Sequence, residues 1–465
     1  MVVLLWLSGS CYDLDSLLQF TLFLGFNMLK KILASAGAVA IIACGPLATG
    51  QIGQSIYTGA VENYHSPYLS ITNKSFERGY FSSNAVSRIE LKNQLKAEFA
   101  EQGLPTVWLV KHHIENGFLG VKSTSEFVID KQIAPIVNQI WGKNVAPMQI
   151  VTDSGFTGST HFVMTVNPMD YKKKDGVSAI SDKFVVQGEF DPENSKSQFS
   201  YSLPALTITT PDKESMVVNN IDGEGQGQMQ GNFWIGHQTF SLENAKFTAS
   251  DQHQFIAIDG VNVAMNNALS QPQGEKNPTE ATQQVTNTNT IQVAKLTTLD
   301  GQHYQDIAFK LALKDLNYKA ISQLAAMEQS PQATQDPAQI KQAMLALDLL
   351  IAHGASVDLS QLSVKTPQGV VNAQLLLNIK PGLEHASTNL TAVTDQLSGN
   401  INIVLPEALV AKEPLLAAKL PILVNQKIVT QQNGNYQLQV KIVADQLEFS
   451  SGAKLPLAMM ALLLH

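Results

Sequence analysis

The sequence carries little charge for its length, and it has no cysteine beyond its first tenth. Its 465 residues include 31 basic and 39 acidic side chains, which give a formal net charge of −8. This balance excludes a strongly basic nucleic-acid-binding protein, because such proteins neutralise phosphates with many Lys and Arg. The two cysteines are Cys11 and Cys44. The body from residue 62 onward therefore has no thiolate for catalysis, metal binding or disulfides, as suits an exported protein in an oxidising compartment.

Amide side chains supply much of the polarity that charge does not. Asn and Gln together number 68, close to the 70 charged residues, and 44% of the chain is apolar. An apolar fraction of this size excludes a charge-rich disordered chain, since it can bury a core. The length allows two or three domains, or one long all-β domain.

Residues 1–27 contain no Lys or Arg, whereas a secretory leader begins with a positive segment. A leader-like pattern starts instead at Met28, where the basic pair Lys30 and Lys31 precedes an uncharged run from Ile32 to Thr49. We therefore interpret residues 1–27 as an upstream extension wrongly assigned to the chain. The alternative is a genuine apolar extension.

The uncharged run of 18 residues is just long enough for a tilted membrane helix. We predict an uncleaved signal-anchor over residues 28–61, with Lys30 and Lys31 on the cytoplasmic side. For a Gram-negative source, the anchor would lie in the inner membrane and the body in the periplasm. Ile41-Ile42-Ala43-Cys44 also resembles a lipobox, which would make Cys44 a lipidated N-terminus. A cleaved signal peptide is the third alternative.

The sequence offers no motif that carries catalysis or binds a cofactor or metal. It has no GxSxG elbow, no HExxH and no P-loop. The cluster His112-His113-Ile114-Glu115 suggests metal ligands, but neighbouring strand residues point to opposite faces, so His112 and His113 cannot easily share an ion. We therefore predict no catalytic, cofactor-binding or metal-binding residues.

Period-two alternation of apolar and polar residues is the dominant pattern of the body. It is typical of strands in antiparallel sheets with one apolar and one wet face. The clearest examples are Ile307–Leu313, Val371–Ile379 and Tyr436–Ile442. We predict a mainly β (α+β) protein: long antiparallel meander sheets, curved to bury one face, with a few helices packed on or beside them.

Glycine-containing segments predict where the strands end. The pairs Asp222-Gly223, Asp259-Gly260, Asp300-Gly301 and Asn433-Gly434 are typical of hairpin turns. The segment Gly223–Gly231 (GEGQGQMQG) is predicted to be flexible or tightly turned.

The predicted organisation has two β-rich regions, 62–270 and 290–465, around a polar loop or linker at 271–289. Helices are predicted near 318–353, with Gly354 just past the end, and near 406–419, where Pro414 should kink or divide the helix. A weaker helix is predicted over Lys131–Trp141.

The segment Phe76-Glu77-Arg78-Gly79-Tyr80-Phe81-Ser82-Ser83 is similar to a family signature, aromatic-x-Arg-Gly-aromatic-Phe-Ser-Ser. With the basic-then-apolar start and the turn Lys365–Gly369, the chain resembles the YdgA-like family of bacterial proteins of unknown function (DUF945). The signature residues are Phe76, Arg78, Gly79, Phe81, Ser82 and Ser83. The resemblance implies an inner-membrane anchor and a periplasmic body, and it implies no catalytic residues. From its own residues, we predict a bulge or bend at Gly79 that tolerates no Cβ.

These patterns lead us to expect a non-enzymatic envelope protein that binds or guides lipid or acyl chains in an apolar groove. The first alternative is a structural or interaction protein that dimerises or scaffolds envelope complexes through sheet edges. The second is an uncharacterised hydrolase. The expected partners are the inner membrane, a lipid ligand and a second copy of the chain, with no nucleic acid.

Overall fold

The computed structural model describes residues 69–459, apart from 102–104, 132, 144, 156, 173–175, 192–195, 231–232, 252, 271–281, 329–336 and 384–388. The predicted extension and the predicted anchor, with Lys30, Lys31, Ile32 and Cys44, lie outside this part. Within it, no helix has the length and apolarity needed to cross a membrane. The chain divides into two compact units between Gln228 and Met229, and each is described by itself.

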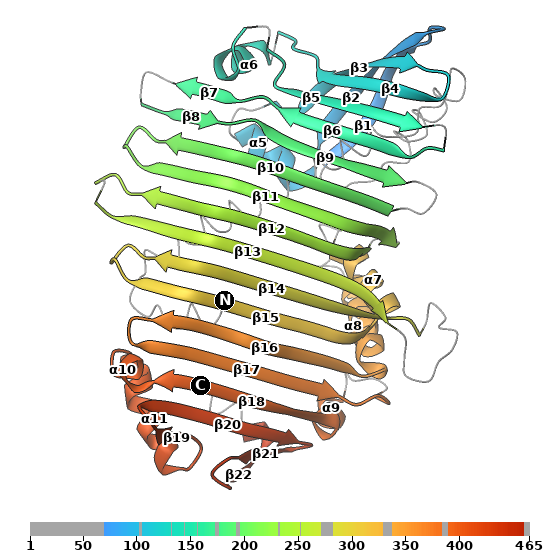
Figure 1. Cartoon of the computed structure of the whole chain (residues 1–465). Helices are drawn as coiled ribbons and strands as arrows, with labels where there is room; N and C mark the ends of the chain where they lie inside the picture. Colours follow the sequence, from blue (N-terminus) through green and yellow to red (C-terminus); the bar gives the residue numbers. More distant parts are fainter. Residues whose placement is uncertain are drawn as a thin grey trace. The chain divides into compact units, whose positions relative to one another are not determined.

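Unit 1 is an antiparallel sheet in which most paired strands are also neighbours in sequence (Figure 1). The pairing order is β1-β2-β3-β4-β5-β6-β9-β10-β11, and β8 pairs with the second half of β10 and with β7. Its elements are β1 (Leu69–Glu77), β2 (Ser82–Leu91), α5 (Asn93–Glu101), β3 (Val107–Asn116), β4 (Gly120–Phe127), α6 (Ala134–Ile140), β5 (Met148–Gly155), β6 (Thr160–Val166), β7 (Met169–Lys172), β8 (Ser178–Ser181), β9 (Phe184–Asp191), β10 (Lys196–Thr209) and β11 (Ser215–Gln230).

Unit 2 is an antiparallel meander, in which each strand from β12 to β18 pairs with the next one along the chain. The order continues β18-β20-β21-β22, and β19 pairs with β20. Its elements are β12 (Phe233–Thr248), β13 (Phe255–Ser270), β14 (Gln284–Thr297), β15 (His303–Asn317), α7 (Tyr318–Glu328), α8 (Pro337–Ala352), β16 (Ala355–Thr366), β17 (Gly369–Ile379), α9 (Leu390–Gln396), β18 (Leu397–Pro406), α10 (Glu407–Val410), α11 (Pro414–Asn425), β19 (Thr430–Gln432), β20 (Asn435–Val443), β21 (Gln446–Phe449), β22 (Lys454–Pro456) and a 3₁₀ turn (Leu457–Met459).

The mainly β, antiparallel architecture predicted from the alternation is confirmed. The three clearest predicted strands lie inside β15, β17 and β20. Helices α7 and α8 occupy the range predicted as helical, and Gly354 follows α8 with a positive φ of 83°. Pro414 divides the helix predicted near 406–419 into α10 and α11, and α6 confirms the weaker prediction.

Two helices, α5 and α9, were not predicted from the sequence. Helix α5 is polar on average, but Leu95 is buried and the Phe99 ring meets Trp108 edge-on, with 5.9 Å between ring centroids. Helix α9 is a short segment capped by Asn389, whose side chain accepts a hydrogen bond from the backbone N–H of Ala392. Both helices depend on contacts that leave no regular apolar spacing in the sequence.

The segment predicted to be flexible or tightly turned lies, up to Gln230, in the second half of β11, so that prediction is wrong. Gly225 pairs with Phe199 of β10, and a Cβ at Gly225 would lie 2.5 Å from the Phe199 ring. Gly188 of β9 also pairs with Phe199, but a Cβ there would lie 2.9 Å from the Phe162 ring. Each glycine therefore makes room for an aromatic ring, which is one reason that glycine occurs inside strands.

Two of the four predicted hairpin turns are present, and two are not. Asp300-Gly301 joins β14 to β15, and Asn433-Gly434 joins β19 to β20 with positive φ at both residues. Asp222-Gly223 lies inside β11, while Gly260 lies inside β13 with φ of 63°. The strand register is continuous on both sides of Gly260, and a Cβ there would lie 2.8 Å from the Ala294 Cβ, so this glycine allows a close approach and does not reverse the chain.

The division between the units does not coincide with the boundary predicted at 271–289. Residues 271–281 lie outside the described part, and strand β14 begins at Gln284, inside the predicted loop. Val285 is completely buried, and the Asn287 side chain donates to Asn267 Oδ1 at 2.6 Å. At this end of the predicted loop, the Asn287 amide is thus a hydrogen-bonded side chain of a strand.

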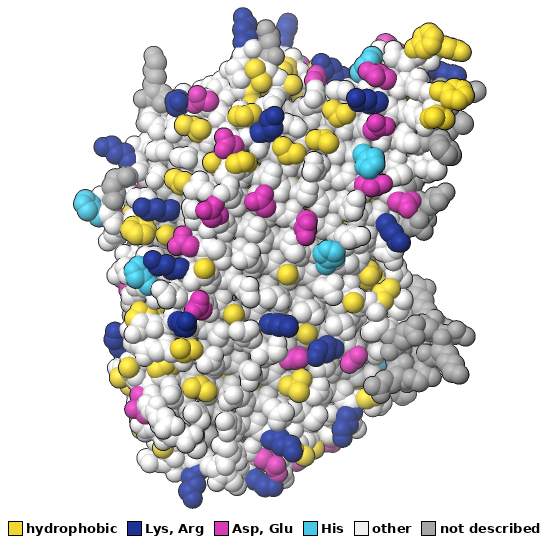
Figure 2. Space-filling model, in the orientation of Figure 1, with side chains coloured by type: hydrophobic (Ala, Val, Ile, Leu, Met, Phe, Trp, Pro, Cys, Tyr) yellow, Lys and Arg dark blue, Asp and Glu magenta, His cyan; other side chains and the backbone are white. Residues whose placement is uncertain are grey.

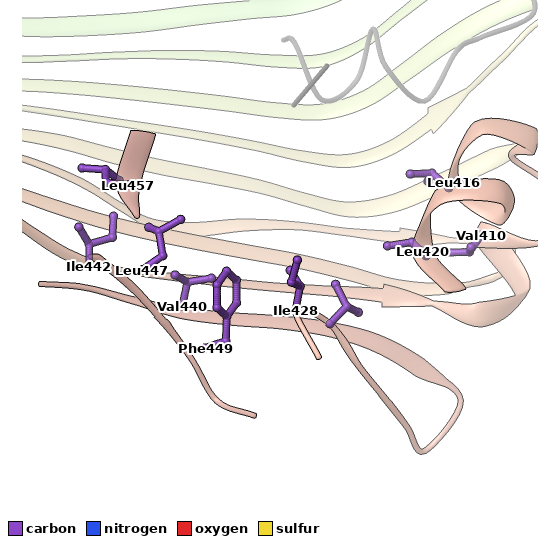
Figure 3. Close-up of a cluster of buried hydrophobic side chains, with 10 residues drawn as sticks. Val410, Leu416, Leu420, Ile428, Val440, Ile442, Leu447, Phe449 and Leu457 are labelled. Carbon is purple, nitrogen blue, oxygen red and sulfur yellow. The ribbon is translucent and has the colours of Figure 1, made fainter. Parts of the chain in front are cut away.

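Buried apolar side chains of the described residues gather in three clusters. One lies on β1–β4 and α5, and a second on β5, β6 and β9. The third lies at the C-terminal end of unit 2, where α10 and α11 contribute Val410, Leu416 and Leu420 against the β20 and β21 side chains (Figure 3). Each fully buried Leu, Ile or Val stabilises the fold by about 1.5–3 kcal/mol.

The Phe199 ring predicts a coupling that can be measured. Gly225→Ala should lower the free energy of unfolding by about 1–3 kcal/mol, because the new Cβ overlaps the ring. In a Phe199→Ala background the same substitution should cost almost nothing. Chemical denaturation of the four proteins gives the coupling energy.

Gly155→Ala is the control, since its nearest neighbours lie 3.9 Å from the position of the new Cβ. An equal cost of Gly225→Ala in both backgrounds would show that the ring is not the reason for the glycine.

Candidate functional site

The signature residues surround the turn between β1 and β2. Phe76 is half-buried and packs against the first core cluster, and Ser83 is buried. Arg78 and Phe81 are exposed at the turn, with Gly79 between them in the chain. The signature therefore combines residues that hold the hairpin in the core with residues that the hairpin presents to solvent.

Gly79 makes the tight bend that the sequence predicted. A Cβ at this position would lie 2.0 Å from the carbonyl oxygen of Ser82, well inside van der Waals contact. The Gly79 N–H also points toward the Ser83 hydroxyl, at 3.4 Å. The prediction that no Cβ is tolerated here is confirmed, and the reason is a close approach of backbone to backbone.

The neighbouring turn between β3 and β4 is hydrogen-bonded to this bend. The Asn116 backbone N–H donates to the carbonyl of Phe81 at 2.7 Å. The Asn116 side chain lies 3.4 Å from the Gly79 carbonyl and 3.5 Å from that of Tyr80. Gly120 also fits closely, since a Cβ there would lie 2.5 Å from the Ser154 carbonyl. The two turns thus form one fixed end of the sheet.

Four large apolar side chains project from these two turns into solvent, and we call them the aromatic end. Their exposed fractions are 89% for Tyr80, 79% for Phe81, 96% for Phe118 and 68% for Leu119. The Tyr80 and Phe81 rings meet edge-on, with 4.9 Å between centroids. Single exposed apolar residues are ordinary, but four of them on two hydrogen-bonded turns are typical of an interaction site. The signal that could have found it is Phe118-Leu119 between Gly117 and Gly120, an apolar pair in a turn.

The two histidines of the predicted polar cluster lie on opposite faces of β3, as their spacing predicted. His112 is buried, and its ring lies 2.9 Å from Ser87 Oγ through Nε2 and 2.7 Å from Ser125 Oγ through Nδ1. His113 is exposed and lies 2.9 Å from Asn84 Oδ1. Burial lowers the pKa of His112 from 6.5 to about 4, because the charged imidazolium loses its hydration. The neutral ring links two strands through serine hydroxyls.

A second candidate site is the apolar face of the unit 2 meander. One row of cross-strand partners crosses eight strands. Its members are Phe240, Val263, Ile291, Phe309, Leu362, Ala373, Ile403 and Leu438. A neighbouring row on the same face runs through Gln238, Met265, Asn289, Leu311, Leu359, Leu375, Ile401 and Val440. The meander therefore presents a mostly apolar surface on one side, interrupted by amides on β12 and β14.

Among the described residues, no buried cluster closes the middle of this apolar face. Phe240, Val263, Phe309 and Leu362 remain half-buried, and Ile291 is 38% exposed. Full burial on this face occurs towards its ends, as at Val285 beside α7 and Ile442 in the C-terminal cluster. We call the half-buried middle, centred on Ile291, Phe309 and Leu362, the open apolar face.

The opposite face of the meander is polar and wet. Its exposed side chains include Asn262, Gln292, Lys310, Gln361, Asn372, Gln374 and Gln439. Figure 2 shows one side of the molecule, where apolar and charged side chains are scattered among the remaining side chains and the backbone. On the wet face, amide side chains supply much of the polarity that charged side chains would otherwise supply, as the composition indicated.

Sites for metal or acid–base chemistry are less evident. Within the described ranges, no group of three His, Cys, Asp or Glu side chains is placed to hold a metal ion. A shallow cavity of about 370 Å³ lies beside β17, β18 and β20, with Lys380, Asp395 and Lys441 in its lining. These side chains form no nucleophile–base pair of the kind used in hydrolysis.

The described chain is an antiparallel β protein with a fixed aromatic end in unit 1 and an open apolar face in unit 2. Residues 28–458 match the family described as bacterial protein of unknown function (DUF945), and the chain belongs to this family. No curated protein and no solved structure matches it.

The depressed pKa of His112 predicts how stability depends on pH. Between pH 6.5 and about 4 the unfolded chain binds a proton that the folded chain does not, so the free energy of unfolding falls as the pH falls. A shift of this size corresponds to about 3 kcal/mol across that window. Chemical denaturation of the wild type and of His112→Gln should show a shallower pH dependence in the variant.

His113→Gln, on the exposed face of the same strand, is the matched control and should leave the pH dependence unchanged. Equal slopes for wild type and His112→Gln would contradict the assignment of this dependence to His112.

Proposed function

We propose that this protein is a membrane-anchored component of the bacterial cell envelope that holds lipid or acyl chains on the open apolar face of unit 2. The observation that carries the proposal is the row of Leu, Ile, Val and Phe that crosses eight strands and stays half-buried in its middle. A soluble sheet normally covers such a face with helices or a second sheet.

The dimensions of the face suit an extended hydrocarbon chain. Eight strands spaced by about 4.8 Å give a row about 34 Å long. Contact with this row removes methylene groups from water, at about 0.8 kcal/mol for each one buried. A dozen buried methylenes would contribute about 10 kcal/mol before the entropy lost on binding, which is enough for retention through purification.

The proposed location rests on the sequence. Lys30 and Lys31 before the uncharged run Ile32–Thr49 have the charge asymmetry of an inner-membrane anchor with its body in the periplasm. A body without cysteine suits that compartment. An anchored protein with an apolar face would have access to membrane lipid, which supports the proposed ligand class.

The test is native mass spectrometry of the full chain extracted from a bacterial membrane. We expect the wild type to carry bound lipid. Ile291→Glu should lose most of it, because a carboxylate on the open apolar face is incompatible with a bound hydrocarbon chain. Ile291 is 38% exposed, so the fold should tolerate the substitution.

Gln292→Glu is the matched control, since this neighbour in β14 lies on the wet face and receives the same new charge. It should keep its lipid. Lipid-free wild-type protein, or equal lipid in the two variants, would contradict the proposal, and a lipid-free symmetric dimer would favour a scaffold that assembles through its own copies.

A further inference from the structure

The aromatic end of unit 1 is not explained by a role for the apolar face of unit 2. Its four side chains are between 68% and 96% exposed, and they lie on two turns held together by the hydrogen bonds of Asn116. The close backbone approaches at Gly79 and Gly120 fix both turns. The fold thus holds a large apolar group in solvent on a rigid support.

We infer that the aromatic end is a membrane-docking element that inserts its side chains into the interfacial layer of a lipid bilayer. Tyr80 has an apolar ring and a polar hydroxyl, a combination enriched at membrane interfaces, and Phe81, Phe118 and Leu119 supply apolar area. Arg78, exposed beside them, is suited to bind lipid phosphate.

The available area favours a bilayer over a protein partner. At about 150–250 Å² for each aromatic side chain, the aromatic end offers roughly 600 Å². A stable protein interface buries about 800 Å² on each partner. Insertion into fluid lipid needs no shape-matched groove, and each apolar side chain that enters contributes separately.

The local charge points to the same occupant. The two hairpin ends, residues 74–84 and 113–122, carry Lys74, Arg78 and Lys122 against Glu77 and Glu115. Three positive and two negative charges give +1, and Asp153, the cross-strand partner of Lys122 on β5, brings the sum to zero. The aromatic end therefore lacks the net negative charge of the whole chain, −8, and meets less repulsion from an anionic bilayer surface.

The chain length also allows such contact. β1 begins at Leu69, 20 residues after Thr49. Those residues can span at most about 70 Å when extended, so an anchored chain has the reach to bring β1 to the same membrane. Of the arguments for docking, only this one, on the reach of the chain, rests on the anchor in the proposed function.

The experiment uses the full chain with Cys11→Ser and Cys44→Ser, reconstituted into vesicles of phosphatidylethanolamine and phosphatidylglycerol. Leu119→Cys carries an environment-sensitive fluorophore. We expect a blue-shifted emission that is quenched more by lipid spin-labelled near the headgroup than at the end of the acyl chain. Adding Phe118→Ser should weaken both effects.

Asp212→Cys is the matched control, because it places the fluorophore in a polar, exposed turn of the same unit, between β10 and β11. It should remain unquenched. Circular dichroism checks that each variant is folded. A Leu119 label that spin-labelled lipid does not quench would overturn the inference. If that unquenched label is also blue-shifted, the result shows a protein contact instead.

The outcome is separable from that of the proposed function. Bound lipid measured on unlabelled protein reports on unit 2, and fluorophore quenching reports on unit 1. Retained lipid with an unquenched Leu119 label would overturn the docking element alone.

Discussion

A sheet that is apolar on one side must cover that side, and the meander of unit 2 does so only in part. At its C-terminal end, α10, α11 and the last strands close a core around Ile442 and Leu447. In the middle, Ile291, Phe309 and Leu362 have cross-strand neighbours, but they belong to no buried cluster of the residues that the structure describes. Because exposed hydrocarbon is costly in water, this half-covered surface is the feature that an account of the protein must explain.

The two units cover their apolar residues in different ways. In unit 1, α5 and the hairpins close one core, while the Phe199 ring lies beside Gly225 of the neighbouring strand. The same unit leaves Tyr80, Phe81, Phe118 and Leu119 in solvent on turns that glycine and Asn116 make rigid. Rigidity matters here, because a flexible turn could fold these side chains back onto the sheet.

Much of the fold could be predicted from the sequence, because alternation in β15, β17 and β20 reports directly which face of a sheet is buried. Turn chemistry was less reliable: Asp300-Gly301 and Asn433-Gly434 reverse the chain, but Gly223 and Gly260 lie inside strands. Gly225 of the same segment faces the Phe199 ring and Gly260 faces Ala294, and such contacts between distant residues are invisible in local sequence. The same applies to residues 284–289 at the end of the predicted loop, where hydrogen-bonded amides belong to β14.

The candidate sites also differ in how far the sequence could predict them. The bend at Gly79 followed from its residue type and context, and the opposite orientation of His112 and His113 followed from strand geometry. The aromatic end could not be predicted in this way, because it needs two turns, about 40 residues apart, to lie side by side. The open apolar face was expected as a groove, but which residues stay half-buried depends on where α7, α8, α10 and α11 pack.

The most direct test of lipid binding is photo-crosslinking with a diazirine-labelled fatty acid, followed by peptide mapping of the full chain. The account predicts labels on the β14, β15 and β16 peptides at Ile291, Phe309 and Leu362. Labels confined to other strands, or to wet-face residues such as Gln292, would contradict it.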